Sequence, residues 1–119
     1  MLFRSQNTLP AINAIINPLN NAPGQGLPAA AVGQRYLLID NIGSAQPWIG
    51  PYGRQIEASA NDIIEYDGSA WRIVFLAAAQ PGEQFVTNLT TSVQYLWTGN
   101  EWIKSYQGVY PGGTWRLVL

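Results

Sequence analysis

From residue 33 onward, short runs of β-branched and aromatic residues alternate with clusters of Gly, Asn, Asp, Pro and Ser. Runs of this composition between turn residues are typical of β-strands. The pattern predicts a short strand around Ile56 and further strands at 35–40, 63–66, 71–76, 84–87, 93–97, 101–106 and 115–119. Short strands with frequent turns indicate an all-β fold, and we predict a small single-domain sandwich or barrel of about seven to eight short antiparallel strands.

The first 32 residues differ in character, because prolines and asparagines recur through them. Prolines at this density exclude a long helix and a central strand. Ile12, Ile15 and Ile16 have helical spacing, Thr8 is a suitable N-cap and Pro18 is a suitable end. We therefore expect at most one short helix in this segment.

The same segment is too apolar for a disordered tail, so we expect a proline- and asparagine-rich arm at 1–32 that docks on a folded surface, followed by a β domain at 33–119. The sequence leaves open whether the arm docks on its own domain or on another subunit. The apolar residues that we expect at such an interface come from the arm and from the end of the chain: Leu9, Ile12, Ile15, Ile16, Leu117 and Leu119.

One short pattern, aromatic-x-Gly-x-x-Trp, occurs three times, at 66–71, 97–102 and 110–115. If the four central residues form a loop, the aromatic residue and the tryptophan become cross-strand neighbours, a pairing that contributes roughly 0.2–1 kcal/mol. Glycine supplies the positive φ that tight loops need. The pattern therefore predicts three β-hairpins, each closed by an aromatic pair.

The remaining aromatic residues allow a second interpretation. Inside the hairpins we expect Trp71, Trp102 and Trp115 to fix register and fill the core. Aromatic residues in loops rich in Gly and Pro are better placed to contact a partner or a carbohydrate, and in this chain they are Trp48, Tyr52, Tyr106 and Tyr110.

Charged residues make up 11% of the chain, against roughly 25% in typical soluble domains, and apolar residues make up 47%. A surface so poor in charge suits a protein that is packed in an assembly, so we expect protein partners and a homo-oligomer. With a net charge of −1 and no run of Lys or Arg, the sequence argues against binding to nucleic acid or an anionic membrane.

The chain contains no cysteine and no histidine. This composition excludes a disulfide framework, a thiolate nucleophile, a cysteine-based metal site and the commonest general base. A hydrolase would have to use carboxylates such as Glu57, Asp62 or Glu65, but alternation along a strand places Asp62 and Glu65 on opposite faces. We predict no catalytic residue, no metal and no cofactor, and hence a protein that is not an enzyme.

Targeting signals are also missing from the pattern. Asn13, Asn17 and Pro18 interrupt the apolar run that a signal peptide needs, and no segment approaches the roughly 20 apolar residues of a membrane helix. We expect neither a signal peptide nor a transmembrane segment.

Several motifs of the β domain together resemble a group of phage proteins: Gly33-Gln34-Arg35-Tyr36, Trp48-Ile49-Gly50, Tyr66-Asp67-Gly68-Ser69-Ala70-Trp71 and Trp97-Thr98-Gly99-Asn100-Glu101-Trp102. In this combination the chain resembles uncharacterised β-rich modules in virion structural proteins of tailed bacteriophages, especially contractile-tailed phages and cyanophages. The resemblance covers roughly 27–119 and leaves the arm unmatched.

The resemblance implies a component of the tail, fibre or neck that is made in the host cytoplasm, resides in the virion and contacts other virion proteins. It brings no known activity and no catalytic residue. We therefore expect a non-catalytic structural or assembly module that acts through protein–protein contacts. The alternative is a receptor-binding module that recognises host surface carbohydrate through its loop aromatics.

Overall fold

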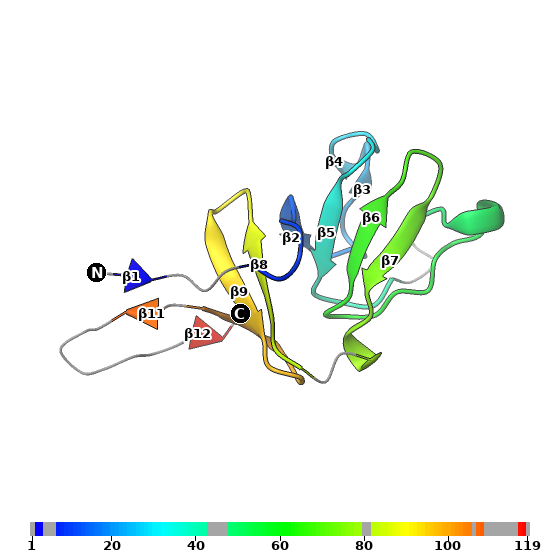
Figure 1. The fold of residues 1–119 in the computed structure, drawn as a ribbon. Helices are drawn as coiled ribbons and strands as arrows, with labels where there is room; N and C mark the ends of the chain where they lie inside the picture. The colour runs from blue at the N-terminus through cyan, green and yellow to red at the C-terminus, as the bar shows by residue number, and fades with distance from the viewer. Residues whose placement is uncertain are drawn as a thin grey trace.

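The computed structural model describes residues 2–3, 7–42, 48–79, 82–105, 107–108 and 117–118. In this part of the chain the regular structure is almost entirely β-strand (Figure 1), which confirms the all-β fold. Two single-turn 3-10 helices, η1 (Pro51–Gly53) and η2 (Ala77–Ala79), interrupt the strands. The strands are β1 (Leu2–Phe3), β2 (Ala14–Ile16), β3 (Ala22–Pro23), β4 (Gly26–Leu27), β5 (Arg35–Leu38), β6 (Ile63–Tyr66), β7 (Trp71–Phe75), β8 (Gln84–Asn88), β9 (Val93–Trp97), β10 (Trp102–Lys104), β11 (Gln107–Gly108) and β12 (Leu117–Val118). No helix among these residues has the length and apolarity that a membrane crossing requires.

Two four-stranded sheets form most of this structure. The central sheet has the order β2-β5-β6-β7 and the second sheet the order β12-β10-β9-β8, while β1–β11 and β3–β4 form separate pairs. β2 pairs with β5, and β3 with β4, in parallel, so the prediction of antiparallel strands alone is wrong. The connection between β2 and β5, residues 17–34, is long enough for the crossover that a parallel pair needs.

The N-terminal segment connects the two sheets of its own chain. The backbone N–H groups of Thr8 and Leu9 both donate to the carbonyl oxygen of Phe85 in β8, at 3.0 and 3.1 Å. Further along the segment, the backbone N–H of Ile12 donates to the carbonyl oxygen of Thr87 at 2.9 Å. The chain then enters β2, which pairs with β5. The expectation of at most one short helix leaves room for this result: no helix forms in the described residues of the segment, because parallel pairing with β5 uses the backbone groups that a helix would need.

Two hydrophobic cores cover opposite faces of the central sheet. The loop-side core combines one face of that sheet with the segments that cross it: Ile16, Ala22, Tyr36, Leu38, Trp48, Ile56, Ala58, Ile64 and Trp71. The intersheet core joins the other face to the second sheet: Ile12, Leu37, Ile63, Phe75, Val86, Tyr95, Trp97 and Trp102. All four residues of β5 are buried, as expected for a strand that is covered on both faces.

A β-bulge in β7 decides which core each of its aromatic residues enters. Ile64 pairs with Ile73 and the adjacent Ile63 pairs with Phe75, so Val74 is an extra residue in β7. In a regular strand, residues 71 and 75 would lie on the same face. Because the extra residue reverses the alternation, Trp71 packs in the loop-side core and Phe75 packs in the intersheet core.

Two of the three predicted hairpins lie within the described residues, and both have the predicted register. Tyr66 pairs with Trp71 across the end of β6 and β7, with ring centroids 5.2 Å apart. Trp97 pairs with Trp102 across the end of β9 and β10, with ring centroids 5.5 Å apart. The aromatic pairs are therefore structural, as the sequence pattern predicted.

The two hairpin loops share one backbone design. In each, the N–H of the first loop residue donates to the carbonyl oxygen of the fourth at 3.0 Å, from Asp67 to Ala70 and from Thr98 to Glu101. Gly68 and Gly99 occupy the same place in the two loops, and both have a φ of 102°, which side chains rarely adopt. The third predicted hairpin, at 110–115, lies outside the described residues.

Phe75 provides the main aromatic contact between the sheets, so its truncation tests this packing. Its ring lies 5.6 Å from that of Trp97 and 5.1 Å from that of Trp102. We predict that Phe75→Ala lowers the free energy of unfolding by about 3–5 kcal/mol, because a fully buried aromatic side chain leaves a cavity. Denaturant unfolding followed by tryptophan fluorescence measures the change.

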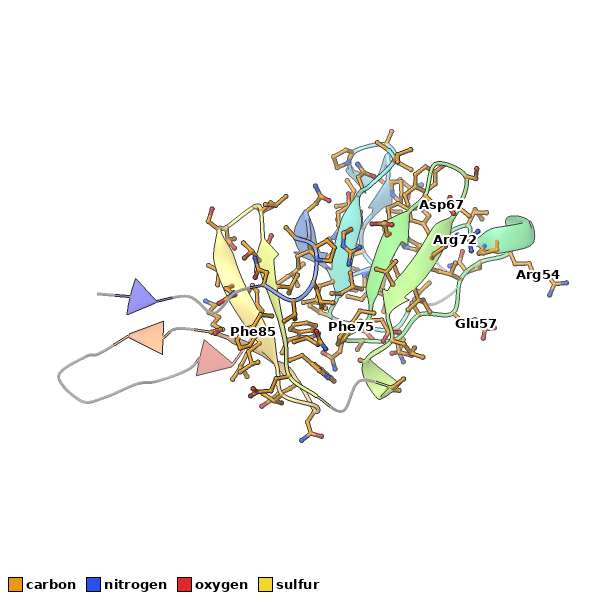
Figure 2. The ribbon with its side chains drawn as sticks, viewed as in Figure 1. Arg54, Glu57, Asp67, Arg72, Phe75 and Phe85 are labelled. Atoms are coloured by element: carbon orange, nitrogen blue, oxygen red, sulfur yellow. The ribbon has the colours of Figure 1, made fainter. Side chains whose placement is uncertain are left out.

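Phe85→Ala is the matched control, since Phe85 is only half-buried on β8 (Figure 2). It carries the same chemical change and leaves the backbone bonds from Thr8 and Leu9 in place. We expect a clearly smaller loss of stability for Phe85→Ala. An equal or larger loss in this control would contradict the role assigned to Phe75.

Candidate functional site

Trp48, the first of the loop aromatics considered for binding, is a core residue. Its side chain is fully buried, with ring centroids 6.2 Å from Tyr36 and 5.0 Å from Trp71. Its indole Nε1 donates to the carbonyl oxygen of Pro18 at 3.3 Å. No face of Trp48 is therefore available to stack on a ligand in this structure.

The side chains of the other three loop aromatics lie outside the described residues. Tyr52 belongs to the backbone of η1, but its side chain lies outside the described residues, as do Tyr106 and Tyr110. Their suggested role in binding stays a prediction.

The residues expected at an interface are covered by their own chain wherever the structure describes them. Ile12 is fully buried and Ile16 is 5% exposed, while Leu9 and Ile15 are half-buried against the intersheet core. Over this stretch the N-terminal segment therefore packs on other parts of the same chain. The side chain of Leu117 and the whole of Leu119 lie outside the described residues.

The three carboxylates considered for hydrolysis have separate environments. Glu57 is exposed, and Glu65 accepts a hydrogen bond from Arg35 Nη1 at 2.9 Å. Asp62 is 2% exposed, and its two oxygens accept the backbone N–H groups of Ser59 and Ala77, both at 2.9 Å. Asp62 thus fixes the ends of two loops. Across the described ranges, no group of three or more Asp or Glu side chains could hold a metal ion.

The most distinctive exposed region is formed by β7, the residue that follows it and the adjoining η1 turn. We call it the β7 surface and define it by Ile49, Pro51, Arg72, Ile73, Val74 and Leu76. Four of its apolar side chains are 37–46% exposed: Ile49 at 45%, Ile73 at 37%, Val74 at 40% and Leu76 at 46%. β7 is the last strand of the central sheet, so these side chains lie at a sheet edge.

Two shallow hollows lie on this surface and share Pro51 and Arg72 as lining residues. One, of about 440 Å³, also includes Ile56, Glu57, Trp71 and Ile73. The other, of about 480 Å³, also includes Ile49, Gly50, Gly53, Ser69 and Ala70. Among the described residues that line the second hollow, Arg72 is the only charged one.

Backbone contacts hold the η1 turn against β7. Trp71 donates its backbone N–H to the carbonyl oxygen of Ile49 at 2.9 Å, and Gly50 donates to Arg54 at 2.6 Å. A Cβ atom on Gly50 would lie 2.0 Å from the side chain of Ile56, so this position requires glycine. Ile56 itself lies in the loop after η1, outside any strand.

Arg72 is oriented by the neighbouring hairpin loop. Its Nε donates to Asp67 Oδ2, and Asp67 Oδ1 accepts the backbone N–H groups of Ser69 and Ala70 at 2.8 and 2.9 Å. The hydrogen bond from Arg72, followed by these two backbone hydrogen bonds, lowers the pKa of Asp67 from 3.8 to about 2. The guanidinium group keeps further N–H donors for groups outside the chain.

One pattern in the sequence indicates that apolar side chains of β7 are exposed, although the strand prediction did not use it. Seven apolar residues in succession follow Arg72, from Ile73 to Ala79. A strand buried on one face can cover only alternate side chains, so part of such a run must be exposed.

No protein family, curated protein or solved structure matches this chain.

The environment of Asp67 predicts a specific pH dependence. Because its pKa is lower in the folded state than the ordinary 3.8, ionised Asp67 stabilises the fold above about pH 4, and this contribution is lost as the pH falls through about 2. Arg72→Ala should raise the pKa of Asp67, since it removes the largest cause of the shift. NMR titration of the Asp67 carboxyl carbon measures the pKa of Asp67 in the unmodified chain and in the Arg72→Ala variant.

Arg54→Ala is the matched control, because Arg54 is exposed and points away from β7 (Figure 2). We expect it to leave the Asp67 titration unchanged. If both arginine variants raised the pKa of Asp67 equally, general charge rather than the specific hydrogen bond would be the cause.

Proposed function

We propose that this chain is a non-catalytic interaction module that assembles through the β7 surface. The observation that supports it best is the row of exposed apolar side chains, Ile73, Val74 and Leu76, at the edge of the central sheet. Exposed apolar residues that gather in one region mark contact sites more often than isolated ones do. Two shallow hollows beside them provide places for side chains of a partner.

The mode of contact that we propose is side-chain packing, not the addition of a strand. A straight, flat edge strand invites another strand, whereas a bulge twists the edge and interrupts its ladder. β7 carries such a bulge around Val74. A partner therefore gains more from covering Ile73 and Val74 than from bonding to the β7 backbone.

Arg72 supports specificity at this surface. Arginine and aromatic residues dominate the binding energy of many interfaces, particularly where apolar neighbours exclude water. Arg72 is already oriented by Asp67 and stands between both hollows, so a partner carboxylate would meet a pre-positioned guanidinium.

We propose that a second copy of the chain binds to this surface. A charge content of 11% and a net charge of −1 favour association over mutual repulsion.

The wider role that we propose is a component of a phage tail, fibre or neck that contacts other virion proteins. This role is supported by the sequence resemblance alone. For the architecture we infer a sandwich, which is supported by separate four-stranded sheets that contribute opposite sides of one core.

We predict that the chain self-associates at micromolar concentration and that Val74→Lys shifts it toward the monomer. A buried lysine without a partner would oppose the packing of an apolar contact. Sedimentation velocity over a concentration series measures the distribution. Val74 is 40% exposed in the single chain, so the substitution should leave the fold intact.

Leu89→Lys is the matched control, since Leu89 is 59% exposed in the turn after β8 and lies outside the β7 surface. It should associate like the unmodified chain. A chain that is monomeric throughout the concentration series, or equal dissociation of both variants, would overturn self-association through β7.

A further inference from the structure

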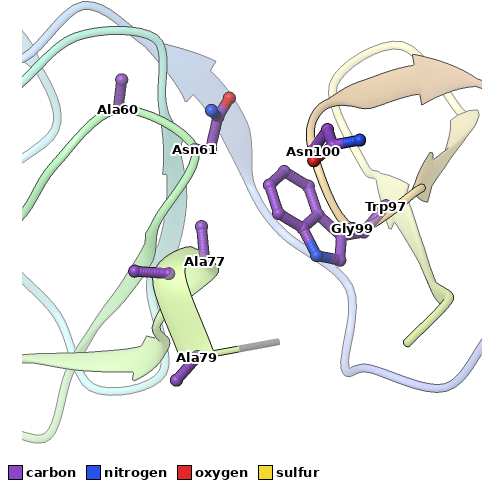
Figure 3. A pocket seen from close by; sticks show the side chains of 8 residues that line it. Ala60, Asn61, Ala77, Ala79, Trp97, Gly99 and Asn100 are labelled. Carbon is purple, nitrogen blue, oxygen red and sulfur yellow. The ribbon is translucent and has the colours of Figure 1, made fainter. Parts of the chain in front are cut away.

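A separate cleft lies where the two sheets meet (Figure 3), and its lining shares no residue with the hollows of the β7 surface. It has a volume of about 640 Å³, which is within the range of small-molecule sites. One wall carries Asn61 and η2, the other carries Asn100 in the loop between β9 and β10, and the indole of Trp97 lies between them. The complete lining is Ala60, Asn61, Ala77, Ala78, Ala79, Trp97, Gly99 and Asn100.

Hydrogen bonds hold the two walls in position. The backbone N–H of Asn61 donates to Leu38 at 2.8 Å, and its carbonyl oxygen accepts the indole Nε1 of Trp102 at 2.9 Å. Trp102 belongs to the second sheet, so this bond ties one wall to the other. Asn61 also has a φ of 77°, an uncommon conformation for a residue with a side chain. These bonds hold the cleft open in the absence of a ligand, so the site is preformed.

Two carboxamides line the cleft beside the indole of Trp97, and both have unused hydrogen-bonding capacity. Within the described part of the chain, neither the Asn61 nor the Asn100 side chain has a hydrogen-bond partner, although both line the cleft. Each carboxamide offers two N–H donors and one oxygen acceptor. None of the described lining residues is charged, and the three alanines of η2 contribute apolar surface to the lining.

We propose that this cleft binds a neutral sugar residue. A pyranose presents adjacent hydroxyl groups that both donate and accept, which matches the two carboxamides, and its C–H groups can lie against the alanine methyls. An anion would find no cationic side chain in the lining, and a metal cation would find no carboxylate. This site differs from the loop aromatics first considered for carbohydrate binding, since the specificity here comes from Asn61 and Asn100.

The test is an NMR titration of the full chain with glucose, galactose, mannose and N-acetylglucosamine, each in turn. The signals to follow are the side-chain NH₂ groups of Asn61 and Asn100 and the indole N–H of Trp97. We expect at least one sugar to give saturable shifts at these signals with a millimolar dissociation constant, about the strength of a few hydrogen bonds.

Two variants then assign the binding to the carboxamides. Asn61→Gly removes the side chain and keeps a residue that accepts positive φ, and Asn100→Ala changes an exposed loop residue. Each should weaken binding roughly tenfold, as the loss of one well-made hydrogen bond requires. Asn20→Ala, which changes an exposed asparagine outside the cleft, should leave the affinity unchanged.

Three results would overturn the proposal. The first is the absence of saturable shifts with every sugar in the panel. The second is sugar binding that both cleft variants retain at full strength, because the site would then lie elsewhere. The third is a response of the cleft signals to a neutral peptide such as tetra-alanine without a response to sugars, which would make the cleft a peptide site.

Discussion

The two cores of this protein depend on one backbone irregularity, the bulge in β7. Without Val74 as an extra residue, regular alternation along the strand would place the side chains of residues 71 and 75 on the same face of the central sheet. With it, Trp71 joins Tyr36 and Trp48 on one side, and Phe75 reaches Trp97 and Trp102 on the other. A single strand thus anchors both cores, and the central sheet is the layer that they share.

The same bulge connects the fold to the proposed interaction. The ends of β7 are buried in the two cores, while Arg72, Ile73 and Val74 between them are exposed. A partner that packs on the β7 surface therefore contacts side chains on a rigid strand that is fixed at both ends, so little conformational entropy is lost on binding. The cleft at Asn61 has a similar basis, because the bond from the Trp102 indole sets the distance between its walls. In both places the exposed groups are positioned by buried aromatic residues.

Features with short sequence separation were predictable. The pairing of Tyr66 with Trp71 and of Trp97 with Trp102 follows from a loop of four residues, and the structure has that register. Features that depend on distant segments were not. The spacing of Ile12, Ile15 and Ile16 matches a helix, but pairing with β5 overrides that local preference. Trp48 lies in a loop rich in Gly and Pro, yet the loop folds over the central sheet and buries the ring completely. The exposure of Val74 depends on a β-bulge, and no residue pattern in β7 predicts that bulge.

Because the loop-side and intersheet cores share the central sheet, they should unfold as one cooperative unit. Each core contains one buried indole N–H with a known acceptor: Trp48 Nε1 donates to Pro18, and Trp102 Nε1 donates to Asn61. Hydrogen exchange of these two indole groups as a function of denaturant measures the opening free energy of each core. We expect equal opening free energies and equal denaturant dependences for the two groups. If one core opened at a distinctly lower free energy while the other stayed protected, the two cores would be independent units and not one cooperative structure.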